Sequence, residues 1–324
     1  MEASLSSISI PLMNLMSMKF RTEVRPDPSA QRIQHSDKLL TMGSCFAGNM
    51  GKQMSALKWQ IMSNPLGISY NPISLFRLLE RAISKYHVTS EQWVQRECLW
   101  HHFDLHGSFS NVDRSLAVKT ANHAIDRVHQ HLASCQFLII TFGTAYIYEK
   151  ADDGAVVTNC HKFPSDHFNK RSLEIAEIVE AGEGLLKKLG EFNPQLKVFL
   201  TVSPIRHLSE GLVNNGRSKA ALLQSCHQLA DYYEKATYFP SYEIMIDDLR
   251  DYRFYKDDLI HPTEMALEYI WDVFSGVHIS DSAKMICERI EKIQRRMEHR
   301  PFNPETEEHQ EFLRNTLSSV RDLS

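Results

Sequence analysis

The sequence lacks the features that mark several large classes of protein. Its six cysteines form no C-x-x-C pair, which argues against a zinc knuckle and against a dense disulfide framework. No run of 18 apolar residues is present, so a membrane span is not expected. Lys and Arg number 36 against 40 Asp and Glu, and no basic run with interleaved aromatic residues occurs, which argues against a nucleic-acid partner. We therefore expect a soluble globular protein with free thiols.

The chain has 324 residues, 43% of them hydrophobic, which is enough to bury a sizeable core in one α/β domain. We expect residues 18–312 to form that domain and residues 313–324 to form a C-terminal tail. Residues 1–17 are expected to be a disordered leader or a misassigned start, because they lack a basic n-region and a small-residue cleavage site. Met18 is the alternative start. Without a signal peptide, the protein is predicted to be cytoplasmic.

Strand-sized apolar runs alternate with helical stretches, an order that favours a parallel sheet with helices on both faces. The predicted strands are Lys38–Met42, Trp59–Met62, Gln136–Phe142, Lys197–Ser203 and Glu243–Asp247. Apolar periodicity predicts helices over Pro72–Tyr86, Ser115–Ser134, Ser172–Leu189 and Ser218–Lys235. The third and fourth strands are almost wholly apolar, as is typical of the centre of a parallel sheet.

Two segments depart from this alternation. After the third strand, AYIYE and AVVT flank the turn-rich KADDG, which predicts a β-hairpin inserted at the carboxyl edge of the sheet. The hairpin would return residues 159–162 (NCHK) to that edge. Near the C-terminus, the periodic Ile286, Ile290 and Ile293 predict a docked helix that ends before RPFNP, followed by a loose tail.

Residues suited to catalysis follow the predicted strands, at the edge where open α/β sheets bind ligands. Ser44 comes directly after Gly43 at a strand-to-helix turn, where its Oγ could be exposed at the helix N-terminus as a nucleophile. Asp258 and His261 stand three residues apart before Pro262, a spacing that lets a carboxylate orient an imidazole. An isolated D-x-x-H is as well explained by an N-cap region in which His261 packs. Its occurrence together with the Gly-Ser turn favours a triad.

Six longer stretches resemble the GSCFA domain family, a group similar to the SGNH/GDSL hydrolases, and the resemblance runs from about Met18 to Phe312. The stretches are GSCFA (43–47), NPLGISYNP (64–72), TFGTAYIYE (141–149), NCHKFP (159–164), TVSPIRH (201–207) and YFPSYEIMIDDLRDYRFYKDDLIHP (238–262). This resemblance implies a flavodoxin-like, three-layer α/β/α sandwich with a five-stranded parallel sheet. It also implies a Ser nucleophile in the first block and an Asp-x-x-His pair in the last, which correspond to Ser44, Asp258 and His261.

The same resemblance implies an oxyanion hole made by the Ser44 amide, the Gly67 amide and an Asn side chain from a third block. In this sequence the third block has Ala145 where the Asn is expected. Losing such a donor typically costs on the order of 10² to 10³ in rate, so another group must replace it or ester hydrolysis is weak. The candidates are Thr144, Asn64 and Asn159. Asn159 is favoured because the hairpin returns it to the edge, and a structural role in a tight turn is the alternative.

Other reactive side chains have competing interpretations. His102, Asp104 and His106 alternate as ligands on one strand face would, but SGNH-type enzymes need no metal, so a histidine-lined pocket wall is favoured. Neither a metal nor a cofactor is predicted. Cys160 invites a thiol-nucleophile interpretation, which is disfavoured because adjacent Cys and His side chains point apart on an extended chain. Cys45 is a rival to Ser44, but we expect it to turn inward and be buried.

Substrate-binding roles are predicted for Thr144, His161, Arg206 and His207, which all follow strands or the hairpin. Arg206 would grip a substrate carboxylate or hydroxyl, with a structural role as the alternative.

The sequence thus predicts a serine-dependent esterase or acyltransferase in which His261 removes the Ser44 proton and Asp258 orients the imidazole. The expected partner is a small ester, with an acylated carbohydrate as the leading class by analogy. The alternative is a small-molecule or carbohydrate-binding module that has lost turnover. The sequence does not distinguish hydrolysis from acyl transfer, and it gives no oligomeric state.

Overall fold

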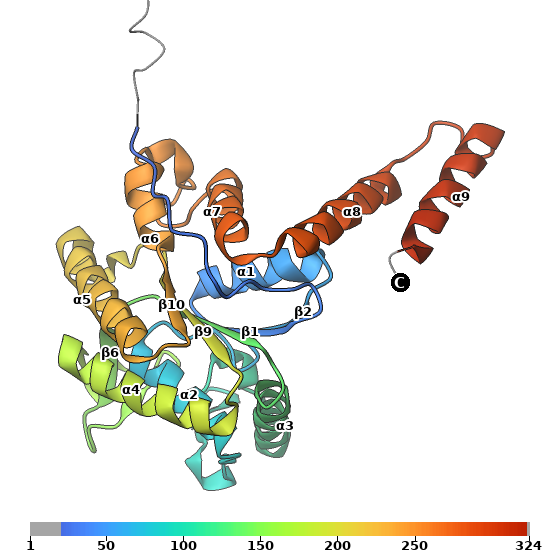
Figure 1. The fold of residues 1–324 in the computed structure, drawn as a ribbon. Coiled ribbons are helices and arrows are strands. Elements are labelled where there is room, and N and C mark those ends of the chain that lie inside the picture. The colour runs from blue at the N-terminus through green and yellow to red at the C-terminus, as the bar shows by residue number, and fades with distance from the viewer. Residues whose placement is uncertain (1–20, 323–324) are drawn as a thin grey trace, which may run out of the picture.

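A five-stranded parallel sheet with strand order β10-β9-β5-β1-β2 forms the centre of the protein (Figure 1). This computed structural model describes residues 21–322, so the predicted leader at residues 1–17 lies outside the described residues. The strands are β1 Lys38–Gly43, β2 Gln60–Ser63, β5 Phe137–Phe142, β9 Lys197–Val202 and β10 Ala236–Phe239. Numbered along the sheet, the order is 2-1-3-4-5, which is that of flavodoxin-like folds. The predicted α/β class and parallel sheet are confirmed.

The central strands are apolar because both of their faces are covered. On β5, Leu138 and Ile140 point into one core, whereas Phe137 and Ile139 point into the other. Strand β5 pairs in parallel register with β1 on one side and β9 on the other. This double coverage explains why the two innermost strands read as uninterrupted apolar runs.

Helices α2 to α5 cover one face of the sheet, and α1, α7 and α8 cover the other (Figure 1). Their bounds are α1 Cys45–Ala56, α2 Pro72–Ile83, α3 Arg114–Leu132, α4 Ile175–Phe192, α5 Gly211–Tyr232, α7 Glu264–His278 and α8 Asp281–Glu298. The four helices predicted from periodicity correspond to α2, α3, α4 and α5. Each begins after a polar or charged cap position, such as Asn71 before α2, whose side chain accepts from the Ser74 amide.

The fifth predicted strand, Glu243–Asp247, is wrong. The edge strand is β10 (Ala236–Phe239), and residues 241–248 form the short helix α6 Ser241–Glu243 and a π-helical turn, Ile244–Asp248. Within the EIMID run, Ile244 and Met245 are fully buried and belong to the same core as α7. A short apolar run of this kind fits a buried helical turn as well as a strand, so periodicity alone did not separate the two.

The predicted hairpin is present and carries a third strand. Strand β6 (Tyr146–Lys150) pairs antiparallel with β7 (Val156–Val157) and, on its other side, with β8 (Phe168–Ser172). A separate small hairpin joins β3 (Val94–Arg96) to β4 (Leu99–His101).

Beyond the sandwich, α8 continues as an arm toward α9 (Glu307–Arg321) (Figure 1). The expected docked helix is α8, which buries Ile290 and Ile293. Residues 313–321, predicted to be part of a loose tail, belong to α9 instead. Thr306 caps α9 by accepting from the His309 amide, a start signal that lies beyond the RPFNP break. Within residues 21–322, no helix combines the length and apolar character needed to cross a membrane.

Candidate active site

The turn after β1 is held by the sheet itself. Gly43 has φ +143°, and a Cβ on it would lie 2.2 Å from the backbone oxygen of Thr141 on the neighbouring strand. Its amide donates to Asn64 Oδ1 at 2.8 Å, and the Ser44 amide donates to the Thr141 oxygen at 3.1 Å. Glycine is therefore required at the end of β1, where two backbones approach closely.

The exposures predicted for Ser44 and Cys45 are reversed in the structure. Ser44 is 0% exposed, and its Oγ caps α1 by accepting from the Phe46 amide at 3.2 Å. Cys45, the first residue of α1, is partly exposed, and its Sγ lies 3.4 Å from the Tyr70 hydroxyl. The N-cap role explains the difference, because a capping side chain must fold back over the helix amides. The catalytic role of Ser44 stays a prediction.

Asp258 and His261 make the contact that their spacing predicts. Asp258 Oδ2 lies 2.7 Å from His261 Nδ1, and Oδ1 accepts from the backbone amides of Ile260 and His261 at 2.8 and 2.9 Å. These backbone hydrogen bonds, followed by the one to the ring, lower the pKa of Asp258 to about 2. The ionised carboxylate holds the proton on Nδ1, which leaves Nε2 with a lone pair that can accept a proton.

Backbone and ring contacts connect the turn after β1 to the loop that carries His261. The Arg206 amide donates to the Ile260 oxygen at 3.2 Å, which ties the end of β9 to the loop that carries His261. The next residue, His207, packs edge-on against Tyr70 with ring centroids 5.1 Å apart. Because Tyr70 contacts Cys45, a continuous set of contacts runs from the turn after β1 to the loop of His261.

His207 is a neutral group at this edge. Burial, and then electrostatic interaction with Lys219 and His261, lower its pKa to about 4. Its Nε2 is buried with no hydrogen-bond partner in the part of the chain that the structure describes, and it would lie 3.0 Å from a Cβ on Gly143. His207 therefore fills the space over Gly143 as an uncharged ring at neutral pH.

Arg206 contacts the loop before α7 and also lines a small pocket with Tyr252 and Tyr255. Its guanidinium lies 3.9 Å from the ring centroid of Tyr255 and 5.5 Å from that of Tyr252, and it donates to the Leu259 oxygen at 3.3 Å. These contacts match the structural alternative for Arg206. The substrate-binding role predicted for Arg206 and His207 stays a prediction.

Two of the three predicted oxyanion donors, the amides of Ser44 and Gly67, are already engaged. The Ser44 amide donates to Thr141, and the Gly67 amide donates to the Asn64 oxygen at 2.8 Å. Asn159 Oδ1 accepts from the His161 amide at 2.8 Å, which matches the structural role in a tight turn that was the alternative for Asn159. Helix α1 begins at Cys45, and its first amides have no backbone partner within the helix, although the Phe46 amide donates to Ser44 Oγ.

The third-block residues face another helix. Ala145 is fully buried, and its amide donates to Ser218 Oγ of α5 at 2.7 Å. Thr144 Oγ1 lies 3.2 Å from the same hydroxyl. Thr144, predicted to bind substrate or replace the missing Asn, is thus already hydrogen-bonded within the fold.

The side chains of the histidine-rich segment after β4 contact other protein groups and do not form a set of metal ligands. Asp104 pairs with Arg77 at 3.2 Å and with Arg81 at 2.9 Å, and His106 Nδ1 accepts from the Ser108 amide. Across residues 21–322, no group of three or more His, Cys, Asp or Glu is placed to hold a metal ion.

His161 packs against the same segment. It is 8% exposed, its Nε2 contacts the His102 oxygen at 2.9 Å, and its ring packs on His101 with centroids 4.6 Å apart. These contacts do not support the substrate-binding role predicted for His161. Its neighbour Cys160 has its pKa raised to about 11 by burial, which suppresses the thiolate at neutral pH.

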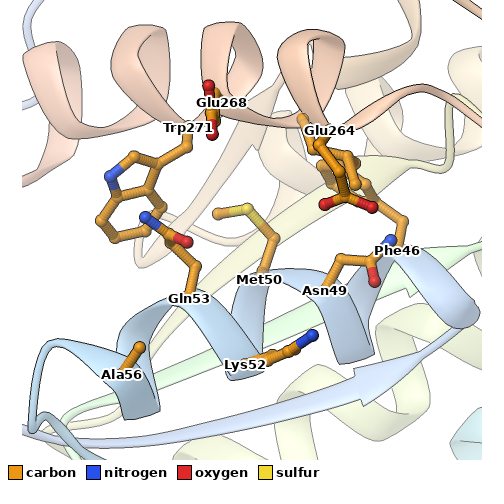
Figure 2. Close-up of a pocket in the computed structure, with 10 residues that line it drawn as sticks. Phe46, Asn49, Met50, Lys52, Gln53, Ala56, Glu264, Glu268 and Trp271 are labelled. Atoms are coloured by element: carbon orange, nitrogen blue, oxygen red, sulfur yellow. The ribbon is translucent and has the colours of Figure 1, made fainter. Parts of the chain in front are cut away.

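A groove of about 190 Å³ lies between α1 and α7, next to this edge (Figure 2). Phe46 and Glu264 lie at one end, and these residues follow Cys45 and His261 closely in sequence. Asn49 and Gln53 of α1 face the groove from one side, and Trp271 of α7 faces it from the other. The groove therefore extends from the edge where the reactive side chains lie, with amide and aromatic groups along it.

Lys219 is a feature of this edge that sequence reasoning missed. It is 1% exposed, and its Nζ donates to the backbone oxygens of Gly143 and Ser203, both at 2.7 Å. Burial lowers the pKa of its ammonium to about 7, whereas the two carbonyl acceptors favour the protonated form. Its position three residues before Leu222, on the apolar face of α5, was the available signal.

Comparison with solved structures finds a distant likeness. An acetyl xylan esterase (Est2A) from the rumen bacterium Butyrivibrio proteoclasticus matches over 64% of this chain and 56% of its own, with 14% identity and a TM-score of 0.32. This chain thus spans little more than half the length of that esterase, and a likeness at this level says nothing about activity. Among curated proteins, none matches.

Family models give a broader match. The model of the GSCFA family covers residues 38–274, from β1 to most of α7, and so includes both the turn after β1 and the Asp258–His261 pair. A second model, the C-terminal domain of GSCFA domain proteins, covers residues 290–324, which include α9. The chain belongs to the GSCFA family.

Proposed function

We propose that this protein is an esterase or acyltransferase that acts on a small ester at the carboxyl edge of its sheet. The observation that carries the proposal is the 2.7 Å contact between Asp258 Oδ2 and His261 Nδ1, on a loop bonded to the end of β9. A histidine with one nitrogen held by a carboxylate and the other free is suited to general base and then general acid catalysis.

The reaction follows from these roles. His261 takes the proton of a nucleophile supplied by the turn after β1, for which the sequence predicts Ser44. The nucleophile attacks the ester carbonyl and forms an acyl-enzyme, and the imidazolium returns the proton to the departing alcohol. Water then gives hydrolysis, or a hydroxyl of an acceptor gives acyl transfer.

The groove between α1 and α7 supports a polar substrate. Asn49, Gln53 and Glu268 offer hydrogen-bonding groups, and Trp271 offers an aromatic surface. An acylated carbohydrate carries many hydroxyls and fits such a lining, so it stays the leading substrate class.

Ester hydrolysis by matched histidine variants tests the proposal. With p-nitrophenyl acetate as substrate, we expect His261→Ala to lose about 10² to 10⁴-fold in kcat/KM, the usual contribution of a general base. His87→Ala is the control, because His87 also contacts a carboxylate, Asp126, at 2.9 Å on the surface, and it should keep its activity. Equal activity in wild type and His261→Ala would contradict the proposal.

A binding module without turnover is the second candidate. It is favoured by Ala145, which stands where SGNH hydrolases carry an Asn donor, and by the engaged amides of Ser44 and Gly67. It predicts that a partly acetylated monosaccharide binds, measured by calorimetry, while no acetate is released by the wild type.

A further inference from the structure

Two adjacent side chains compete for the role of nucleophile, and their surroundings differ. Ser44 is fully buried, and its Oγ accepts from the Phe46 amide. To attack a substrate, this hydroxyl would first have to become exposed. Cys45 is partly exposed at the same turn, and its Sγ lies 3.4 Å from the Tyr70 hydroxyl. The turn thus presents a thiol where the sequence predicts a hydroxyl.

Cys45 also lies within a cluster of titratable groups. Its Sγ is 3.4 Å from the Tyr70 hydroxyl, Tyr70 packs on His207, and the neighbouring backbone of Arg206 is bonded to that of Ile260, beside His261. Burial raises the pKa of Tyr70, so its phenol keeps its proton and can donate it in a hydrogen bond to a thiolate. The buried, unpartnered Nε2 of His207 belongs to the same cluster.

The helix that begins at Cys45 favours negative charge at this point. Helix α1 has 12 residues, and no acidic side chain lies in its first turn to oppose an anion. The amides of its first turn carry partial positive charge, which favours negative charge that develops at this end of the helix during attack.

We propose that Cys45 is the nucleophile of this site and that the reaction passes through a thioester on its Sγ. This inference rests on the proposed function, because it needs the same ester substrate and the same base. It replaces Ser44 in the mechanism and leaves Ser44 as the N-cap of α1.

The atoms balance as follows. The Cys45 thiol proton passes to His261 Nε2, the S–C bond to the acyl carbon forms, and the ester C–O bond breaks. The leaving oxygen takes the proton from His261, which yields the free alcohol. Water, or an acceptor hydroxyl, then gives its proton to His261 and attacks the thioester, and the S–C bond breaks. The returning proton restores the thiol, so neither an oxidant nor a reductant is needed.

Acyl-enzyme mapping tests the proposal on the full chain. Protein treated with p-nitrophenyl acetate is quenched in acid, digested and analysed by mass spectrometry. We expect one acetyl group on the peptide that contains Cys45, released by neutral hydroxylamine as a thioester is. Cys45→Ala should lose this adduct and at least about 100-fold in hydrolysis. Cys98→Ala, at an exposed cysteine outside the cluster, should lose neither.

Two further variants separate this inference from the proposed function. Cys45→Ser should carry a hydroxylamine-resistant ester, which a merely structural cysteine would not produce. Loss of hydrolysis in His261→Ala with full hydrolysis in Cys45→Ala, or an adduct on Ser44, would overturn the Cys45 assignment and leave the esterase standing. Full hydrolysis in both variants would overturn both. Circular dichroism of each variant checks that the fold is retained.

Discussion

The turn after β1 and the loop before α7 lie at the same edge of the sheet but are held by different forces. The turn is part of the sheet's own hydrogen bonding, since Gly43 and Ser44 are bonded to Asn64 and to Thr141 of β5. All of these contacts are made by neutral backbone or amide groups. The turn therefore keeps its shape at any pH at which the sheet is folded.

The loop that carries His261 is held in large part by the ionised side chains of Asp258 and Arg206. The Asp258 carboxylate accepts three hydrogen bonds, two of them from backbone amides, and Leu259 between them has φ +56°. Both Asp258 and His261 are nearly half exposed. The turn after β1 is therefore held by neutral hydrogen bonds, whereas the loop that carries His261 depends on charged side chains.

Asp258→Asn changes the loop that carries His261 and is expected to have the largest effect on hydrolysis. The amide removes the negative charge that holds the Nδ1 proton, so hydrolysis of p-nitrophenyl acetate should fall by about 10³ to 10⁴-fold. The urea midpoint should change little, because the residue is exposed. Asp126→Asn, at the surface pair with His87, is the control, and a similar loss there would remove the distinction.

Acid should act on the same carboxylate. Its folded-state pKa of about 2 lies below the ordinary 3.8, so the stability it contributes is complete above about pH 4 and is lost as the pH falls through about 2. NMR of the His261 ring should therefore report an unchanged Asp258 contact down to pH 4. Loss of that contact between pH 5 and 6 would contradict this assignment.

Gly43→Ala breaks the turn side. A Cβ would lie 2.2 Å from a backbone oxygen that cannot move without displacing β5, so we expect a loss of about 3 kcal/mol or more in the free energy of unfolding. Gly154→Ala is the control, because Gly154 also has positive φ (+70°) but has open space around it. It should cost only about 1 to 2 kcal/mol, measured by urea unfolding. Equal costs would mean that the close approach to Thr141 is unimportant.

Ser44→Ala is expected to have the smallest effect of these substitutions, on both stability and hydrolysis. If Ser44 acts as the N-cap, its loss costs about 1 kcal/mol of stability, similar to Thr306→Ala at the N-cap of α9. Hydrolysis should fall far less than in Cys45→Ala. A loss of activity as large as that of Cys45→Ala would restore Ser44 as the nucleophile.

Local features were predictable from sequence, and features set by tertiary contacts were not. Asp258 and His261 were paired correctly because three residues of chain already bring their side chains together. Four strands were placed from their apolar runs, but β10 was missed because EIMID, with three consecutive large aliphatic residues, lies just after it. In that segment the burial of Ile244 and Met245 against α7 decided for helix.

The exposure of Ser44 and Cys45 shows the same limit. Ser is a favoured N-cap residue and Cys is not, which was a signal that Ser44 caps the helix, but residue type does not say how far either side chain is exposed. Tyr70 comes to Cys45 only because the segment after β2 is bonded to the ends of β1 and β5, through Ser69 to Gly43 and Gly143 to Tyr70. Such contacts between distant segments leave no periodic pattern in the chain.

The Lys219 bridge between the ends of β5 and β9 has a consequence for ionic strength. The ammonium donates to two uncharged carbonyl groups and is buried away from solvent. Dissolved ions therefore cannot approach it, and these hydrogen bonds involve no opposite charge that salt could screen. Surface pairs such as Lys188–Glu80 weaken in concentrated salt, but this bridge does not. The distance between the ends of β5 and β9 should therefore be the same in concentrated salt as in dilute buffer.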